Sequence, residues 1–87
     1  MNTLERIEAA LRAGLAPESL HIEDESHLHA GHAGARGGGG HYKVHVVSEA
    51  FRGKGLVERH RMVYALLGDA MRGEIHALAI TARAPGE

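Results

Sequence analysis

A chain of 87 residues with a formal net charge of −1 has room for one domain and one modest hydrophobic core. It contains no cysteine, which excludes disulfides and thiolate ligands or nucleophiles of its own. Its first residues are acidic and polar, and no apolar run approaches the ~20 residues of a membrane span, so we expect a soluble, cytoplasmic protein. A cleft that encloses a substrate from all sides is hard to build in so short a chain, so we expect a protein that binds partners and is not an enzyme.

The first quarter of the chain is predicted to form a helix and then a strand. Apolar residues recur at helical spacing over about residues 3–13, after Thr3 as a possible N-cap. Gly14 and Pro17 are typical of a helix end. Apolar and polar residues then alternate over residues 19–25, which predicts a half-buried strand.

Residues 26–40 are predicted to form a long mobile loop. Six of them are glycines, and each glycine loses extra backbone entropy when it is ordered. A loop of this length in a compact domain is usually either functional or disordered.

Two more strands and a second helix are predicted after this loop. Residues 41–48 alternate with period two and place three apolar side chains on one face: Tyr42, Val44 and Val46. An apolar stripe predicts a helix over about 55–72, and its members are Leu56, His60, Val63, Leu67 and Ala70 or Met71. Residues 75–81 are short, apolar and partly β-branched, which predicts a third strand. We expect the first two strands to be antiparallel, and the third to be parallel to the second because a helix connects them.

Positive charge is concentrated in the middle of the chain. Residues 1–35 carry a net charge of −4, whereas residues 36–61 carry +4. The middle segment is therefore the plausible contact for an anionic partner. Its candidate phosphate contacts are Arg52, Lys54, Arg59 and Arg61, although a charged helix start is more often a solvated face.

Histidine is unusually frequent, with eight residues in the chain. Four of them line the predicted loop and its end, a composition that is loosely typical of metal binding: His27, His29, His32 and His41. Their spacing matches no known zinc finger. His60 lies on the apolar stripe of its helix, where we expect a packed, hydrogen-bonded structural side chain, and His21 and His45 are expected to be exposed on their strands.

Three motifs, in order and at matching spacing, resemble those of the BolA family. They are Phe51-Arg52-Gly53, the run Arg-His-Arg-Met-Val-Tyr over residues 59–64, and the strand that opens Ile75-His76-Ala77-Leu78. The match covers most of residues 4–85, and several linked motifs are more specific than any one alone. The resemblance implies an α+β fold of order αββααβ, in which a three-stranded mixed sheet packs against helices as in a class II KH domain. It implies a single domain over residues 1–87 with a flexible Gly/His-rich loop at about 27–40.

The same resemblance implies a function as a binding module. BolA-like proteins pair with monothiol glutaredoxins and share a glutathione-ligated [2Fe–2S] cluster, in iron–sulfur or iron homeostasis or trafficking. One ligand in that pairing is the histidine of the His-Ala-Leu strand, here His76. A second ligand comes from the loop between the first two strands, where His29 matches best and His32 and His27 are alternatives. The protein is then expected to be a cluster-free monomer alone and a heterodimer in the complex.

The residue types in this chain agree with a cluster whose ligands come from two proteins and glutathione. Iron–sulfur clusters take most of their ligands from thiolates, and this chain has none to give. It could supply imidazoles only, so the partner and glutathione would supply the thiolates. The orientation of His76 is the difficulty, because it shares strand parity with Leu78 and Ile80. We expect it at the exposed first turn of its strand.

A second interpretation is DNA binding. Some BolA-like proteins are described as transcriptional regulators, and residues 49–67 could form a helix–turn–helix-like unit within the positive segment. A near-neutral isoelectric point and the lack of an aromatic stacking platform argue against nucleic acid. A DNA-binding transcriptional regulator is therefore the alternative function.

Overall fold

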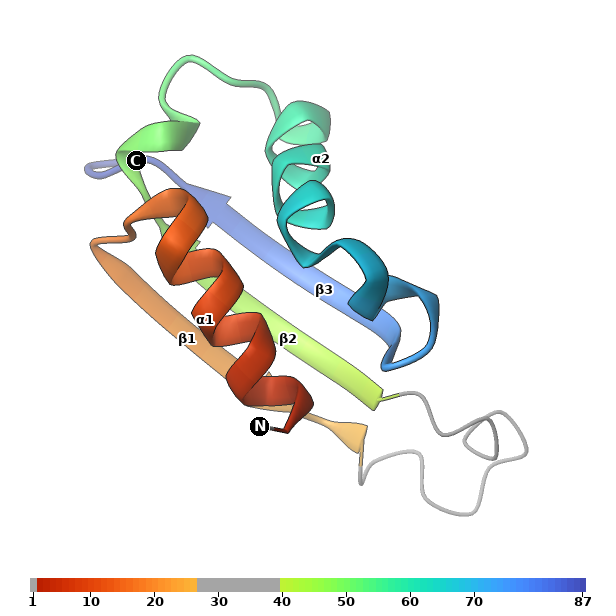
Figure 1. The fold of residues 1–87 in the computed structure, drawn as a ribbon. Coiled ribbons are helices and arrows are strands. Elements are labelled where there is room, and N and C mark those ends of the chain that lie inside the picture. Colours follow the sequence, from red (N-terminus) through yellow and green to blue (C-terminus); the bar gives the residue numbers. More distant parts are fainter. Residues whose placement is uncertain (1, 27–39) are drawn as a thin grey trace.

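A three-stranded sheet carries two helices in the computed structural model, which describes residues 2–26 and 40–87 (Figure 1). In chain order the described elements are α1 (Thr3–Leu15), β1 (Ser19–Asp24), β2 (Gly40–Val47), the 3₁₀ turn η3 (Glu49–Phe51), α2 (Leu56–Leu67), the 3₁₀ turn η4 (Gly68–Arg72) and β3 (Ile75–Arg83). Strand β2 is central, antiparallel to β1 and parallel to β3. The predicted α+β fold with a mixed sheet is therefore confirmed, and the additional short helix before α2 is a single 3₁₀ turn.

The loop predicted over residues 27–40 lies outside the described residues, except for its last member. Gly40 is the first residue of β2. Neither described helix reaches the length of about 20 residues that a bilayer crossing needs, and neither is apolar enough for one.

Helix α1 is capped by a different residue from the one predicted. The side chain of Asn2, not that of Thr3, accepts a hydrogen bond from the backbone N–H of Glu5 at 2.8 Å, and the Glu5 carboxylate accepts one from the Asn2 N–H at 3.0 Å. This reciprocal capping box satisfies two of the free N–H groups of the first turn. The helix also continues past the predicted stop at Gly14. That glycine lies where α1 approaches α2 closely, since a Cβ there would come within 2.3 Å of Leu66 Cδ2.

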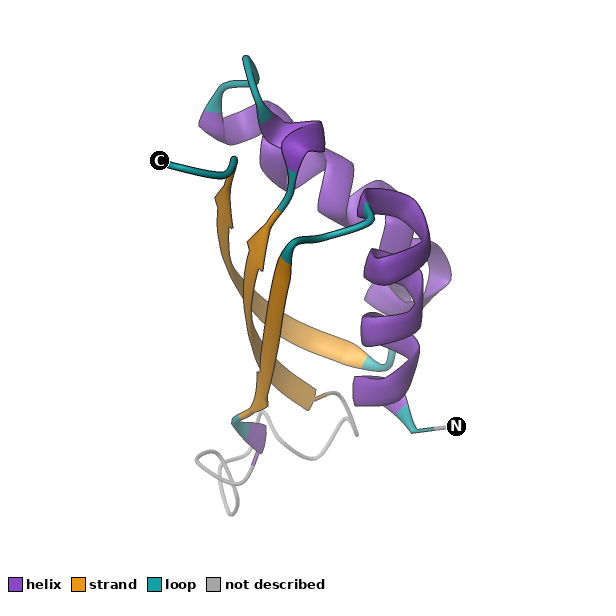
Figure 2. Cartoon of the chain, turned by 90° about the vertical axis from the view of Figure 1, so that its left-hand side faces the viewer, coloured by secondary structure: helices purple, strands orange, loops and turns teal. Residues whose placement is uncertain are grey.

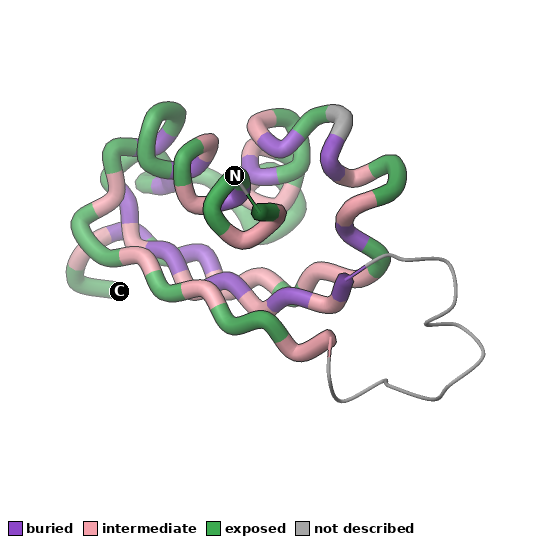
Figure 3. The backbone as a smooth tube through the Cα atoms, turned by 60° about the horizontal axis from the view of Figure 1, so that its bottom comes forward, coloured by how far each residue is buried: buried purple, intermediate pink, exposed green. Residues whose placement is uncertain are grey.

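One hydrophobic core fills the space between the sheet and the helices (Figure 3). Along β2 the even-numbered residues are buried and the odd-numbered ones half-buried, which confirms the predicted alternation. Helices α1 and α2 and the turn η3 contribute the other large buried side chains. The largest that are fully buried are Phe51, Ile7, Leu11, Val44, Val46 and Val63.

Helix α2 is shorter than the predicted range 55–72. The chain leaves the helix at Gly68, whose φ of 52° favours glycine, and continues as the 3₁₀ turn η4. Leu56 was predicted on the apolar stripe, but it is 67% exposed. The stripe meets the core only from His60 onward, because the first turn of the helix extends beyond the core.

Candidate functional site

The two faces of the sheet have different surroundings. Both helices pack against one face, and no described helix covers the other (Figure 2). We call that second face the open face. It is formed by the odd-numbered residues of β1 and β2 and by the residues of β3 beside them. On β2 it carries His41, Lys43 and His45.

His76 is exposed because the pairing between β2 and β3 is irregular. Ile75 pairs with Gly40 and Ala77 pairs with His41, so His76 between them has no partner residue on β2. Such a bulge re-aims a side chain and shifts the alternation of the strand by one residue. Ile75 is buried before the bulge, whereas the even-numbered residues face the core after it. The predicted exposure of His76 is confirmed, and the bulge is its physical cause.

His41 is the neighbour of His76. The centroids of the two imidazole rings lie 5.1 Å apart, with the ring planes tilted by 43°. His41 belongs to the histidine group noted in the sequence, but it was not singled out as a ligand. A pairing argument could have found it, because each histidine is the second residue of its strand and the two parallel strands begin at the same level.

The end of the first described range, at Ser26, lies beside this histidine pair. The backbone N–H of His41 donates to Ser26 Oγ at 3.0 Å, and the N–H of Glu25 donates to the His41 carbonyl at 2.7 Å. Ser26 and Gly40, the described residues on either side of positions 27–39, therefore both lie near His41. Three of the predicted ligands lie outside the described residues: His27, His29 and His32.

Two side chains of helix α1 bind Glu74, in the turn that precedes His76. The guanidinium of Arg6 forms an ion pair with the Glu74 carboxylate, and Thr3 Oγ1 donates to the same carboxylate at 3.2 Å. The N–H of Gly40 donates to the Glu74 carbonyl at 3.0 Å. These contacts tie the first residues of β2 and β3 together directly beside the two imidazoles.

The histidine pair alone is an incomplete metal site. Within residues 2–26 and 40–87 no three histidine or carboxylate side chains converge closely enough to hold a metal ion. Two imidazoles are nonetheless donors that iron, zinc and copper accept. The remaining ligands would have to come from the undescribed segment or from a partner.

Arg59, one of the four predicted phosphate contacts, is engaged within the chain. Its side chain is only 12% exposed, and its guanidinium donates to both carboxylate oxygens of Glu87, at 2.6 and 2.8 Å. It also donates to the carbonyls of Lys54 and Ala82. The hydrogen bonds from Arg59, with one from the Ala84 N–H, lower the pKa of Glu87 to about 2.

The other three basic residues are more exposed. Arg52 donates two hydrogen bonds of 2.8 Å to Glu49, which lowers the pKa of that carboxyl group, and a third to the Pro85 carbonyl. Lys54 Nζ lies 3.9 Å from a carboxylate oxygen of Glu58. Arg61 is exposed on α2. The structure therefore leaves Lys54 and Arg61 as the more available cations.

The predicted helix–turn–helix-like segment 49–67 has one full helix, not two. Its first part, η3, is a three-residue 3₁₀ turn, and α2 follows after a short connection. His60 of α2 is packed as predicted, but the expected hydrogen bond to its Nε2 is absent. That buried atom has no partner among the described residues.

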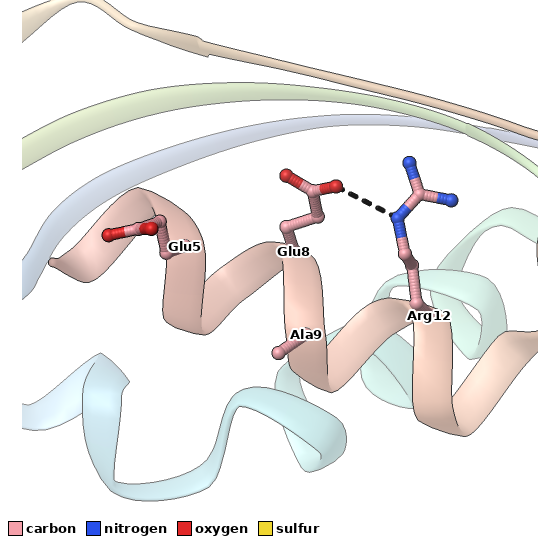
Figure 4. A pocket seen from close by; sticks show the side chains of 4 residues that line it. All are labelled: Glu5, Glu8, Ala9 and Arg12. Atoms are coloured by element: carbon pink, nitrogen blue, oxygen red, sulfur yellow. Dashed lines mark hydrogen bonds and ion pairs between the residues drawn. The ribbon is translucent and has the colours of Figure 1, made fainter. Parts of the chain in front are cut away.

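A shallow pocket on α1 lies apart from these groups (Figure 4). Its lining side chains are Glu5, Glu8, Ala9 and Arg12, all from one helix. Arg12 Nε donates to a Glu8 carboxylate oxygen at 2.8 Å, so these two opposite charges are already paired, and the Glu5 carboxylate belongs to the capping box of the helix. We assign it no part in the site.

Comparison with known proteins adds the family. A model of the BolA-like protein family matches residues 11–87. SufE-like protein 1, chloroplastic/mitochondrial, of Arabidopsis thaliana is 46% identical over 87 residues, which cover 94% of this chain and 24% of that protein. The chain thus spans about a quarter of the length of that relative.

A bacterial relative and a solved structure agree with the family model. The DNA-binding transcriptional regulator BolA of Escherichia coli (strain K12) is 42% identical over 76 residues, which cover 87% of this chain and 70% of that protein. The solved structure of BolA1 from Arabidopsis thaliana superimposes with a TM-score of 0.84 at 42% identity, covering 98% of this chain and 94% of that one. The fold, the three motifs and these matches together show that the chain belongs to the BolA-like family.

Proposed function

We propose that this chain is a non-enzymatic binding module that partners a monothiol glutaredoxin and co-ligates a glutathione-bound [2Fe–2S] cluster, in iron–sulfur or iron homeostasis or trafficking. The observation that carries the proposal is the His41–His76 pair, in which a bulge turns His76 outward beside a second imidazole. Membership of the BolA-like family supports the choice of partner.

The donor set explains why the cluster must be shared. A [2Fe–2S] cluster takes most of its ligands from thiolates, and this chain contains no cysteine. Its imidazoles would bind one iron, while the glutaredoxin and glutathione supply sulfur. Imidazole in place of thiolate removes negative charge and raises the reduction potential, as in Rieske centres. The protein alone is then a cluster-free monomer, and the complex is a heterodimer.

The identity of the second nitrogen ligand has several candidates. From the family resemblance we propose His29, with His32 and His27 as alternatives, and the structure adds His41 because its ring already lies beside that of His76. The three residues from Ser26 to His29 span at most about 11 Å of chain. Ser26, three residues before His29 in the chain, is hydrogen-bonded to His41, which supports His29 as a candidate.

Reconstitution with a monothiol glutaredoxin, glutathione, iron and sulfide tests the proposal. We expect a coloured heterodimer whose reduced cluster shows nitrogen couplings in pulsed electron paramagnetic resonance. His76→Ala should lose a nitrogen coupling, whereas His45→Ala, a matched control on the same face, should retain both. Unchanged couplings in His76→Ala would contradict the proposal. Alanine variants of His27, His29, His32 and His41 then identify the second ligand by the loss of the other coupling.

DNA-binding regulation is the second candidate function. It is supported by the name of the Escherichia coli relative and by the positive charge of residues 36–61. With Arg59 and Arg52 engaged within the chain, we expect Lys54 and Arg61 to carry the phosphate contacts. Replacing both with Ala should flatten the slope of log affinity against log salt by up to about 2, at about 0.9 per contact. Absence of any gel shift at low salt would retire this function.

The cellular location is part of the proposal as well. We propose residence in the cytoplasm, while the Arabidopsis thaliana relative is named as chloroplastic/mitochondrial. Fractionation of the source cells, followed by immunodetection of the chain, would distinguish the two.

A further inference from the structure

A second pair of histidines lies on the open face, separate from the His41–His76 pair. His21 of β1 and His45 of β2 are opposite each other in the antiparallel register, with ring centroids 6.3 Å apart. His45 is four residues along β2 from His41, which corresponds to about 13 Å of strand. The two pairs therefore cannot share one metal ion without a large rearrangement.

A carboxylate accompanies this second pair. Glu23 follows His21 by two residues on β1, so the two side chains point to the same side of the sheet. A carboxylate oxygen of Glu23 lies 3.9 Å from Nε2 of His45. Two imidazoles and one carboxylate thus gather on two paired strands, and about 44–45% of the His45 and Glu23 side chains remains exposed.

We propose that His21, His45 and Glu23 bind a divalent transition-metal ion of the zinc class. Two histidines and one glutamate form a donor set that zinc accepts, and a tetrahedral ion then keeps a fourth position for water or a ligand from a partner. The site needs no thiolate, which suits a chain without cysteine.

The side chains must move before the three groups can bind one ion, and for His45 and Glu23 the movement is small. The three groups do not yet converge as a preformed site, in keeping with the absence of such a cluster from the described residues. Two ligand atoms at about 2.1 Å from a tetrahedral ion are about 3.4 Å apart. The observed 3.9 Å between His45 Nε2 and Glu23 is about half an ångström longer, a gap that rotation of exposed side chains can close. The paired strands meanwhile hold the backbone positions fixed.

Lys43 is the natural competitor of the metal ion. It is the cross-strand partner of Glu23 in the register, so its ammonium group can reach the same carboxylate and repels an incoming cation. Removing that charge should strengthen metal binding. This gives the proposal a gain-of-affinity test that unfolding of the protein could not imitate.

Titration of the full chain with Zn²⁺, followed by imidazole NMR shifts and calorimetry, tests the site. We expect the His21 and His45 signals to shift together and to saturate at one ion. His45→Gln should weaken the response of His21 by at least the 10–100-fold typical of residues that merely orient a metal ligand. Glu23→Gln should weaken it less, and Lys43→Gln should strengthen it. Glu49→Gln, the control at an exposed carboxylate of η3, should leave it unchanged.

Three results would overturn the proposal. They are an unchanged His21 midpoint in His45→Gln, zinc-dependent shifts confined to the other histidines, and unsaturated shifts at all histidines that indicate an adventitious ion only. Because the titration uses neither a glutaredoxin nor a cluster, its failure would leave the proposed iron–sulfur function untouched.

Discussion

The two faces of strand β2 differ in the burial and the chemical kind of their side chains. On the covered face of β2, Val44 and Val46 are at most 1% exposed and belong to the core cluster that also contains residues of both helices. The open face of the same strand carries His41, Lys43 and His45, which are only half-buried. The comparison shows that the hydrophobic core lies on one side of the sheet and the two histidine pairs on the other. The face on which a residue lies should therefore decide the effect of its substitution, more than its position in the chain.

The largest expected effect tests the covered face. Phe51→Ala should lower the free energy of unfolding by about 3–5 kcal/mol, because it leaves a cavity at a side chain that is 0% exposed. His21→Gln on the open face should change it by no more than about 0.5 kcal/mol. Urea unfolding followed by circular dichroism measures both, and Phe51→Leu serves if the alanine variant does not fold. Equal effects at the two residues would refute the comparison.

A buried hydroxyl group on the covered side gives the next effect. Ser48 Oγ donates to the Leu15 carbonyl at 2.6 Å and accepts from the Ala50 N–H at 3.1 Å, and the residue is fully buried. Ser48→Ala leaves both backbone groups without this partner, so we expect a loss of about 1–3 kcal/mol. The control is Ser19→Ala at the exposed start of β1, with an expected change within about 0.5 kcal/mol. A neutral Ser48→Ala would show that water replaces the hydroxyl.

His60 sharpens the comparison because it is an imidazole on the covered side. Its Nε2 is buried and has no hydrogen-bond partner among the described residues. His60→Leu should therefore stabilise the protein by about 1 kcal/mol, since an unsatisfied buried polar atom is removed. His45→Leu on the open face should bring no such gain. A clear loss of stability in His60→Leu in thermal unfolding would indicate that His60 has a partner in solution.

The smallest expected effect concerns the surface ion pair between Arg59 and Glu87. The folded pKa of Glu87, about 2, lies below its ordinary value of 4.5, so the stabilisation is complete above pH 4.5 and is lost as the pH falls toward 2. The difference in unfolding free energy between the wild type and Glu87→Gln should shrink over that window. In an Arg59→Gln background the same substitution should have a weaker pH dependence. A difference that stays constant down to pH 2.5 would disprove the pairing.

Much of the fold follows from periodicity in the sequence. Period-two and helical spacing predicted both helices and all three strands, and the buried side of β2, within a few residues. The errors fall where tertiary contacts override local patterns. Gly14 resembles a helix end but serves a close approach of two helices, and Leu56 continues an apolar stripe beyond the core that the stripe serves.

The candidate site was predicted less completely. The motifs identified His76 and placed it near the start of a strand, and the exposure of that residue is confirmed. The contact between His41 and His76 was missed, because a neighbour from another strand is visible only once the register is known. Arg59 looks like a free cation in the sequence, but its partner Glu87 is 28 residues away.

The sequence by itself determined the element order, the buried side of β2 and the resemblance to the family, because local periodicity and short motifs of neighbouring residues carry them. Only the tertiary structure decided which histidines meet. A single unpaired residue in β3 turns His76 outward, and the strand registers place His41 beside it and His21 opposite His45. Register and bulges are set by long-range pairing of whole strands, in which a shift of one residue moves every side chain to the other face.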